Sequence, residues 1–257
     1  MKNYVWCIEG MAHFGRLVAS VLEWDLLIDT PVPDCDTVFI VGLYDPPNYS
    51  HTLGMTKRAK RRVIQFCGSD VIFLAKPAML PEATFTCDGE ALKDELWEKG
   101  IEATVCTLPT TFHSTVTPLP EKPCVAVYFG SNATKYGSQQ VRMLQDVFPD
   151  VEWLTYPYGE YSTEQMVDVV RRATVYLRLT EHDGGAVSSR EYLEAGRRVI
   201  CTSEMPYTTR VRHDDLAAII IALRRALREA EPDYEAAAYY HEFNSTERFK
   251  ADMEAVL

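Results

Sequence analysis

The chain has 257 residues, 47% hydrophobic and 25% charged, which suits a globular protein of one large or two small α/β domains. Its formal net charge of −11 excludes a general binder of nucleic acids or anionic membranes, because the mean field repels phosphates. No apolar run reaches the roughly 18 residues that span a bilayer, and the first residues are too polar for a signal peptide, so we expect a soluble, cytoplasmic protein.

The first 108 residues alternate between strand-like and helix-like segments, judged by the spacing of their apolar residues. Gly100 is well placed to end the last of these helices. The pattern predicts strands at 4–10, 36–45, 63–67, 83–87 and 101–108, and helices at 13–24, 51–63 and 90–100.

A change of composition follows at residues 108–124. This segment holds Pro109, Pro118, Pro120 and Pro123 and has no periodic pattern, so we interpret it as a linker between two domains.

After the linker the alternation starts again. Ser162 and Gln165 form a capping box at the start of one helix. The pattern predicts strands at 124–130, 151–157, 174–180 and 198–203, helices at 138–148, 162–173, 186–196 and 214–230, and a helical tail.

Strands that alternate with helices imply parallel sheets covered on both faces. We therefore predict an α/β protein with two doubly wound, Rossmann-like domains whose parallel sheets face a central cleft. The expected parts are an N-terminal domain at 1–110, a linker at 111–123, a C-terminal domain at 124–235, and a helix at 236–257 that packs back on the N-terminal domain. Ligands of such sheets lie beyond the carboxyl ends of the strands.

The segment 176–203, YLRLTEHDGGAVSSREYLEAGRRVICTS, contains one such loop. Gly184 and Gly185 lie between a strand and a helix, where backbone amides and the positive end of the helix are suited to a phosphate. Glu191 on the helix is placed to accept two hydrogen bonds from a vicinal diol such as a ribose, and Asp183 is placed to accept from a sugar hydroxyl. The alternative is that Asp183 and the glycines only form a turn and a helix cap.

The motif DGGAVSSREYLEAGRRVI resembles the donor-site segment of retaining GT-B glycosyltransferases of the group 1 type, in a compact variant similar to bacterial and phage members. The resemblance implies that Asp183 contacts the donor sugar, that the amides of the glycine loop meet the diphosphate, and that Glu191 binds the ribose. Gly185 stands where the family usually has an aromatic residue, and Ala186 where it has a second glycine.

A second motif, VAVYFGSNATKYG, resembles the strand and turn that open the donor domain of that family. The resemblance places Ser131 and Asn132 in the turn and gives Lys135 the role of neutralising the diphosphate. Asn132 occupies the vicinity of a family arginine, whose charge Arg178 is a candidate to supply. The alternative for Lys135 is an ordinary solvated lysine.

Other candidate residues lie in neighbouring loops. Tyr156 and Tyr158 are candidates for contacts with the base, against the alternative of a buried aromatic residue or a turn. His182 is a candidate donor to the leaving phosphate or sugar, although a single histidine is more often structural.

In the N-terminal half, the loop EGMAHFGR resembles the glycine-bearing turn that faces the diphosphate and acceptor in GT-B enzymes. Gly10 and His13 are its candidates, and His13 is alternatively a local helix cap. Asp70, in the segment GSD, either orients or deprotonates an acceptor hydroxyl or caps a following helix.

Metals, cofactors and disulfides are not expected. Asp34–Asp36, DCD, precedes a strand and is interpreted as turn chemistry. The seven cysteines are odd in number and widely spaced, which indicates reduced, buried thiols. The basic run KRAKRR at 57–62 is interpreted as a solvated helix face, with attraction of a polyanion such as DNA as the alternative.

The resulting hypothesis is a metal-independent, retaining glycosyltransferase that uses a nucleotide-diphosphate sugar such as a UDP-sugar. Its acceptor is open between a glycan, a small molecule and a hydroxymethylated base in phage DNA. The alternatives are a non-catalytic nucleotide-sugar-binding protein and a sugar-nucleotide epimerase on the same fold.

Overall fold

A computed structural model describes residues 2–45, 49–68, 70–72, 74, 82–130, 132–157, 159–182, 184 and 186–257. Contacts between Cα atoms divide the chain into two compact units. Unit 1 is Met1–Pro109 with Asn244–Leu257, and unit 2 is Thr110–Phe243.

Unit 1 is built on a parallel sheet of six strands in the order β2-β1-β3-β4-β5-β6. Its strands are β1 Tyr4–Cys7, β2 Asp25–Ile28, β3 Cys35–Val41, β4 Ala59–Phe66, β5 Thr84–Cys87 and β6 Thr104–Val105. Its helices are η1 Glu9–Met11, α1 Ala12–Leu22, α2 Ser50–Thr56, α3 Glu90–Glu98 and α9 Thr246–Val256.

Unit 2 is built on a parallel sheet of five strands in the order β11-β10-β9-β7-β8. Its strands are β7 Cys124–Tyr128, β8 Glu152–Tyr156, β9 Val175–Arg178, β10 Arg198–Cys201 and β11 Thr208–Arg210. Its helices are α4 Ser138–Val147, α5 Thr163–Arg172, α6 Val187–Glu194, α7 Leu216–Ala226 and α8 Tyr234–Phe243.

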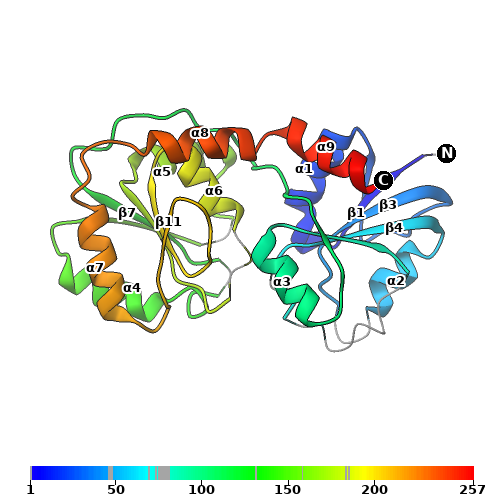
Figure 1. Cartoon of the computed structure of the whole chain (residues 1–257), viewed down its shortest axis with the longest axis horizontal. Coiled ribbons are helices and arrows are strands. Elements are labelled where there is room, and N and C mark those ends of the chain that lie inside the picture. Colours follow the sequence, from blue (N-terminus) through cyan, green and yellow to red (C-terminus); the bar gives the residue numbers. More distant parts are fainter. Residues whose placement is uncertain are drawn as a thin grey trace. The chain divides into compact units, whose positions relative to one another are not determined.

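Both sheets are covered on both faces, because successive residues of a strand point to opposite sides. In β1, Val5 packs in the apolar cluster that includes α1 and α9, whereas Trp6 packs in the cluster that includes α3. In β7, Val125 packs with α4 and α7, and Ala126 packs with α5, α6 and α8. Figure 1 shows α4 and α7 on one face of the second sheet and α5, α6 and α8 on the other. The α/β, doubly wound fold class is therefore confirmed.

Each sheet has one topological switch point. The chain runs from β1 to β2 on one side of β1 and then places β3 on its other side, and it does the same with β7, β8 and β9. Loops that leave such a pair of strands diverge, and ligands bind in the crevice outside their carboxyl ends. The loops after β1 and β3 in unit 1, and after β7 and β9 in unit 2, are therefore the places where each unit is suited to hold a ligand.

Four local expectations differ from the structure. The run KRAKRR at 57–62 is not a helix face, because α2 ends at Thr56 and β4 begins at Ala59. The short edge strands β2 and β11 were not expected from the sequence. The tail forms two helices, because Ser245 accepts from the Arg248 N–H and starts α9 as a new helix.

The segment expected to be a linker is packed onto unit 2 at three places. Thr111 contacts Glu191, His113 contacts Glu194, and the guanidinium of Arg197 donates to Thr117. The three partners stand at intervals of three residues along α6 and the turn after it. The stretch therefore belongs structurally to the second sheet and its helices.

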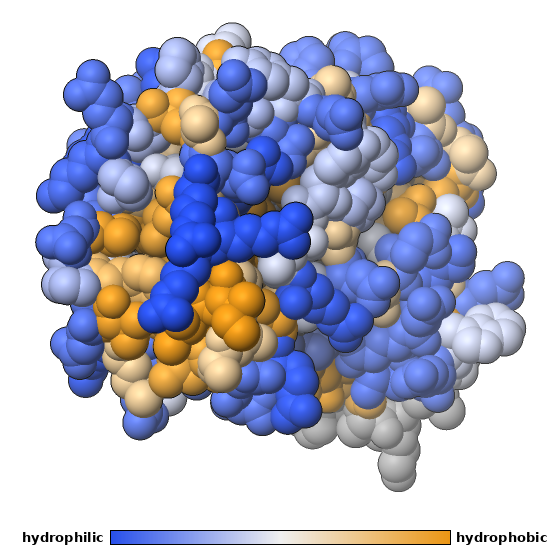
Figure 2. Space-filling view, turned by 60° about the vertical axis from the view of Figure 1, so that its left-hand side comes forward, coloured by the Kyte–Doolittle hydropathy of each residue, from blue (hydrophilic) through white to orange (hydrophobic). Residues whose placement is uncertain are grey.

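All seven cysteines are free thiols, and six of them are buried, whereas Cys67 is only partly buried. Within the described ranges, no helix has the length and apolarity needed to cross a membrane. Figure 2 shows a mostly hydrophilic face with its largest apolar patch at the lower left. Met143 and Val147 of α4 and Ile221 of α7 are among the exposed apolar side chains of unit 2.

Candidate functional site

The start of α6 is the first element of the candidate site. Ala186 is the N-cap of this helix, with φ −54° and ψ 135°. Tyr176 of β9 and Ser188 in the first turn join their hydroxyls at 2.9 Å, which fixes the helix start against its preceding strand. A helix N-terminus outside the carboxyl end of a central parallel strand is suited to an anion.

The turn after β7 is held against the end of β9. Gly137, which caps α4, has φ +72°, and a Cβ there would lie 2.8 Å from the Leu179 Cβ. Asn132 accepts a hydrogen bond from the backbone N–H of Lys135 at 3.3 Å and closes the turn. The half-buried Lys135 is therefore carried by a turn that lies beside the residue following β9.

Arg178 ends β9 at the same switch point. Its guanidinium carbon lies 5.1 Å from the ring centroid of Tyr136 and 6.0 Å from that of Tyr128. These distances are within the range of cation–π contacts, which orient the planar group. Two cationic side chains, Arg178 and Lys135, are thus positioned by the two loops that diverge from β7 and β9.

Glu191 lies buried on α6 and is tied to the segment after unit 1. Its Oε1 accepts the hydroxyl of Thr111 at 2.5 Å and the backbone N–H of Thr111 at 3.2 Å. Burial raises the pKa of Glu191 to about 7, although the Thr111 hydrogen bonds and the nearby Arg190 act to lower it. Both of these hydrogen bonds use Oε1, so Oε2 is the oxygen with which a diol would have to engage.

The tyrosines around α6 form a buried framework. Tyr156, at the end of β8, joins its hydroxyl to that of Tyr192 at 3.1 Å, and the Tyr192 ring stacks on Tyr176 at 4.1 Å. Burial raises the pKa of Tyr156 and of Tyr192 well above the ordinary tyrosine value. This geometry favours the buried-aromatic alternative for Tyr156 over contact with a base.

In unit 1, Gly10 lies in η1 and His13 in the first turn of α1, whose N-cap is Met11. A Cβ at Gly10 would meet only Ile8 Cδ1, at 4.0 Å, so packing does not require a glycine there. Partial burial and the charge of Arg16 lower the pKa of His13, which favours the neutral ring.

Asp70 is fully buried, and its carboxylate is hydrogen-bonded to backbone groups of the chain. Its carboxylate accepts the backbone N–H groups of Leu43, Cys67 and Gly68 at 2.9–3.2 Å. Burial raises the pKa of Asp70 to about 6, against the effect of these bonds. The donors precede Asp70 in the chain, so the bonds are not those of a helix cap; they join the loops after β3 and β4.

Four candidates, Asp183, Gly185, Ser131 and Tyr158, lie outside the described residues. His182 and Gly184 are described as half-buried residues of the loop after β9. The structure thus brings Lys135, Arg178, Asn132, Ala186 and Glu191 into one unit, and it places Gly10, His13 and Asp70 in the other.

Among the described residues, one cluster of potential metal ligands was missed by the sequence reasoning. His113, Glu194 and His241 place one potential ligand atom each within 4.8 Å of one another. They stand 81 and 47 residues apart in sequence, so no local spacing signal joins them. Only the docking of the segment after Pro109 and of α8 onto α6 brings them together.

With this geometry established, the chain has the fold of the GT-B glycosyltransferases. It is similar to the galactosyltransferase WaaB of the lipopolysaccharide outer core, with 10% identity, a TM-score of 0.67 and coverage of 99% of this chain and 100% of that one. It is also similar to sucrose-phosphate synthase from Thermosynechococcus elongatus, with 12% identity, a TM-score of 0.65 and coverage of 100% and 96%.

Staphylococcus aureus TarM, solved in a complex that contains UDP, matches with 10% identity and a TM-score of 0.66. The match covers 85% of this chain and 55% of TarM, so the chain spans about half the length of that protein. No protein-family model matches the sequence, and no curated protein matches it in sequence. These likenesses are of fold.

Proposed function

We propose that the protein transfers a glycosyl group from a nucleotide-diphosphate sugar, such as a UDP-sugar, to an acceptor hydroxyl. The observation that carries the proposal is the convergence of Lys135, Arg178 and the N-terminus of α6 at the β7/β9 switch point. Two cations and a helix N-terminus form a site for a polyanion in an otherwise acidic chain.

In the proposed reaction the nucleotide diphosphate leaves as an anion. The positive end of α6, with Lys135 and Arg178, stabilises the charge that develops on the leaving phosphate, so the transfer step needs no metal. Glu191 Oε2 and Asp183 accept hydrogen bonds from the ribose and the donor sugar. We propose transfer with retention, in which the leaving phosphate helps to deprotonate the acceptor on the same face of the sugar.

The acceptor is proposed to be a glycan or a hydroxymethylated base in DNA, and the basic run separates these two. Lys60 forms an ion pair with Asp36 at 2.8 Å, and Arg61 donates to the carbonyls of Val256 and Leu257. Because these charges are engaged within unit 1, the run is less suited to DNA than a free basic face. A glycan is therefore the favoured acceptor, and the reduced cysteines support a cytoplasmic location.

The test is to incubate the full chain with several nucleotide sugars and to follow release of nucleotide diphosphate with and without glycan and hydroxymethylated-DNA acceptors. Release that depends on an acceptor and on Lys135 supports the proposal. Two other classes give different results: a non-catalytic binder shows saturable binding without release in any mixture, and an epimerase on the same fold yields a free epimerised sugar without an acceptor.

A further inference from the structure

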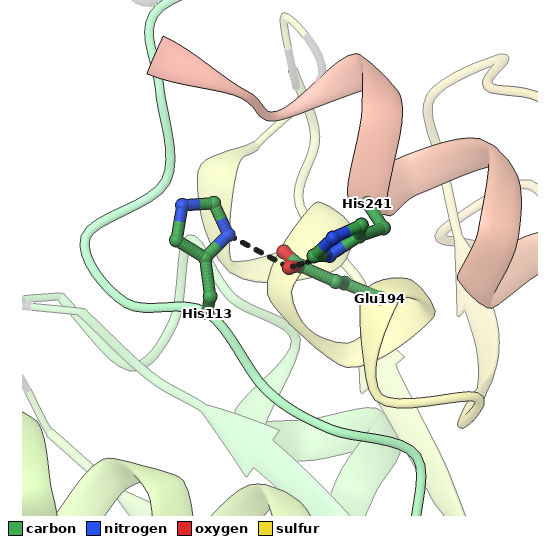
Figure 3. A group of neighbouring side chains, drawn as sticks. All are labelled: His113, Glu194 and His241. Carbon is green, nitrogen blue, oxygen red and sulfur yellow. Dashed lines mark hydrogen bonds and ion pairs between the residues drawn. The ribbon is translucent and has the colours of Figure 1, made fainter.

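Two histidines from distant parts of unit 2 contact the carboxylate of one glutamate, Glu194. His113 lies just after the point where the chain first enters unit 2, Glu194 is the last residue of α6, and His241 lies on α8. The Nδ1 of His113 lies 2.7 Å from Glu194 Oε1, and the Nδ1 of His241 lies 3.3 Å from the same oxygen. Figure 3 shows both imidazole rings directed at the Glu194 carboxylate from opposite sides.

The three side chains of the cluster differ in their exposure to solvent. The side chain of Glu194 is fully buried, whereas those of His113 and His241 are 46% and 76% exposed. A buried carboxylate is costly unless it is paired, while the exposed rings leave the cluster open to solute. The cluster therefore combines a fixed oxygen ligand with two accessible nitrogen ligands.

Two imidazole nitrogens and one carboxylate oxygen form a ligand set that Zn²⁺ accepts, with water in the fourth position. Zinc bonds of about 2.0–2.1 Å in a tetrahedral arrangement require neighbouring ligand atoms about 3.3 Å apart. The His241–Glu194 separation of 3.3 Å already meets this requirement, and the His113–Glu194 separation of 2.7 Å needs a small outward movement of an exposed ring. The ligand atoms of the two histidines lie within 4.8 Å of each other, so an ion also requires these exposed rings to adjust toward each other.

The chain offers an internal comparison for the alternative of a simple ion pair. His51 Nε2 lies 3.0 Å from Asp29 Oδ1, with both side chains partly exposed. That pair has one histidine and one carboxylate, whereas the Glu194 cluster has a second histidine on the same oxygen. If the Glu194 cluster is a metal site, it therefore binds a metal ion more tightly than the His51–Asp29 pair does.

We propose that His113, Glu194 and His241 form a Zn²⁺ site with a structural role, separate from the residues assigned to the donor. His113 and His241 each lie within four residues of a passage between the units, at Pro109–Thr110 and at Phe243–Asn244. A bound ion cross-links both connecting segments to α6, and this stabilises unit 2. The proposal does not depend on the proposed glycosyl transfer.

The experiment is isothermal titration of the metal-free full chain with Zn²⁺ against a competing chelator, together with Co²⁺ absorption spectra. The variants are His113→Ala and His241→Ala, which remove exposed rings, and the matched control is His51→Ala. We expect one zinc ion per chain, a zinc-dependent rise in Tm, and a loss of affinity of more than about tenfold in each site variant, since even second-shell partners cost about 10- to 100-fold.

Equal zinc affinity in the wild-type protein and in both site variants would overturn the proposal, as would the absence of one-to-one binding. A thiolate-to-cobalt charge-transfer band would also overturn it, because that band assigns the metal to cysteines. A tetrahedral Co²⁺ spectrum that persists in His51→Ala and is lost in His113→Ala supports it. None of these readouts uses enzyme activity.

Discussion

At the scale of single residues, Glu191 has two roles in this account. Its Oε1 accepts two hydrogen bonds from Thr111, and we propose that its Oε2 binds the ribose of the donor. The carboxylate is buried at a place where its charged form is disfavoured, as its pKa of about 7 indicates. Under this proposal one side chain both anchors Thr111 and binds the ligand, because each role uses a different carboxylate oxygen.

The raised pKa of Glu191 predicts a pH dependence of stability. Because the folded chain holds the proton up to about pH 7 and the unfolded chain releases it near the ordinary value of 4.5, wild-type stability falls as pH rises through this window. Glu191→Gln lacks this loss, so its unfolding free energy relative to wild type rises by about 3 kcal/mol between pH 4.5 and 7.5. Urea unfolding at several pH values measures this, and a difference independent of pH contradicts it.

At the scale of elements, the close approach of the α4 start to the end of β9 determines where Lys135 lies. Gly137 permits this approach by its positive φ and its missing side chain. The segment after Pro109 is likewise held in place, by contacts with Glu191 and Glu194 of α6 and with Arg197 in the turn after it.

Gly137→Ala is expected to lower both stability and nucleotide affinity, because its Cβ would clash with Leu179. The matched control is Gly159→Ala, which has φ +75° but no atom of a described residue within 4 Å of the added Cβ. Both variants lose about 1–2 kcal/mol from the left-handed backbone, and only Gly137→Ala loses more. Chemical denaturation and nucleotide titration of both variants test this; equal losses would contradict the packing argument.

Arg197→Leu is expected to destabilise the protein by about 3 kcal/mol or more, because several buried carbonyl groups lose their donor. The guanidinium of Arg197 donates to Val170, Arg171, Thr117 and Pro118. The control is Arg172→Leu, whose exposed ion pair with Glu152 contributes about 0–1 kcal/mol. If the two variants unfold at similar urea concentrations, Arg197 does not stabilise the packing of the Thr117–Pro118 segment onto unit 2.

The long periodic elements were predictable from the sequence, whereas the anchors were not. Apolar spacing predicts α7, and the capping box at Ser162 predicts the start of α5. The strands β2 and β11 lie at the edges of the sheets and contain no fully buried residue, so they lack the buried apolar run of the central strands. The pairs of Thr111, His113 and Thr117 with α6 join residues about 80 apart, so they depend on tertiary packing.

The candidate site was partly predictable for the same reason. Glu191, Lys135 and the start of α6 are recognisable because a strand–turn–helix pattern is local. The burial of Tyr156 and Asp70 was not, because it is set by neighbours from other elements: Tyr192 in one case, and the loop after β3 in the other.

At the scale of the whole molecule, the chain passes from unit 1 to unit 2 and returns. The last helix, α9, belongs to unit 1, where Phe249 meets the ring of Phe39 edge to face at 6.2 Å. The return gives unit 1 a part of its core from the far end of the described chain.

Phe249→Ala is therefore expected to cost about 3–5 kcal/mol of stability in unit 1, since it empties a buried site of that core. Lys250→Ala, an exposed neighbour on α9, should change stability by less than about 0.5 kcal/mol. Unfolding followed through tryptophan fluorescence checks this; a Phe249→Ala variant as stable as the control would remove α9 from the core.

The central claim is that unit 2 binds the diphosphate of a nucleotide at the β7/β9 switch point. Calorimetric titration of the full chain with UDP and other nucleoside diphosphates tests it most directly, using Lys135→Ala and the exposed control Lys122→Ala. We predict saturable one-to-one binding that is retained in Lys122→Ala and weakened by about tenfold or more in Lys135→Ala, which corresponds to about 1.4 kcal/mol. The absence of binding by every nucleoside diphosphate, or equal affinity in the two variants, would contradict the claim.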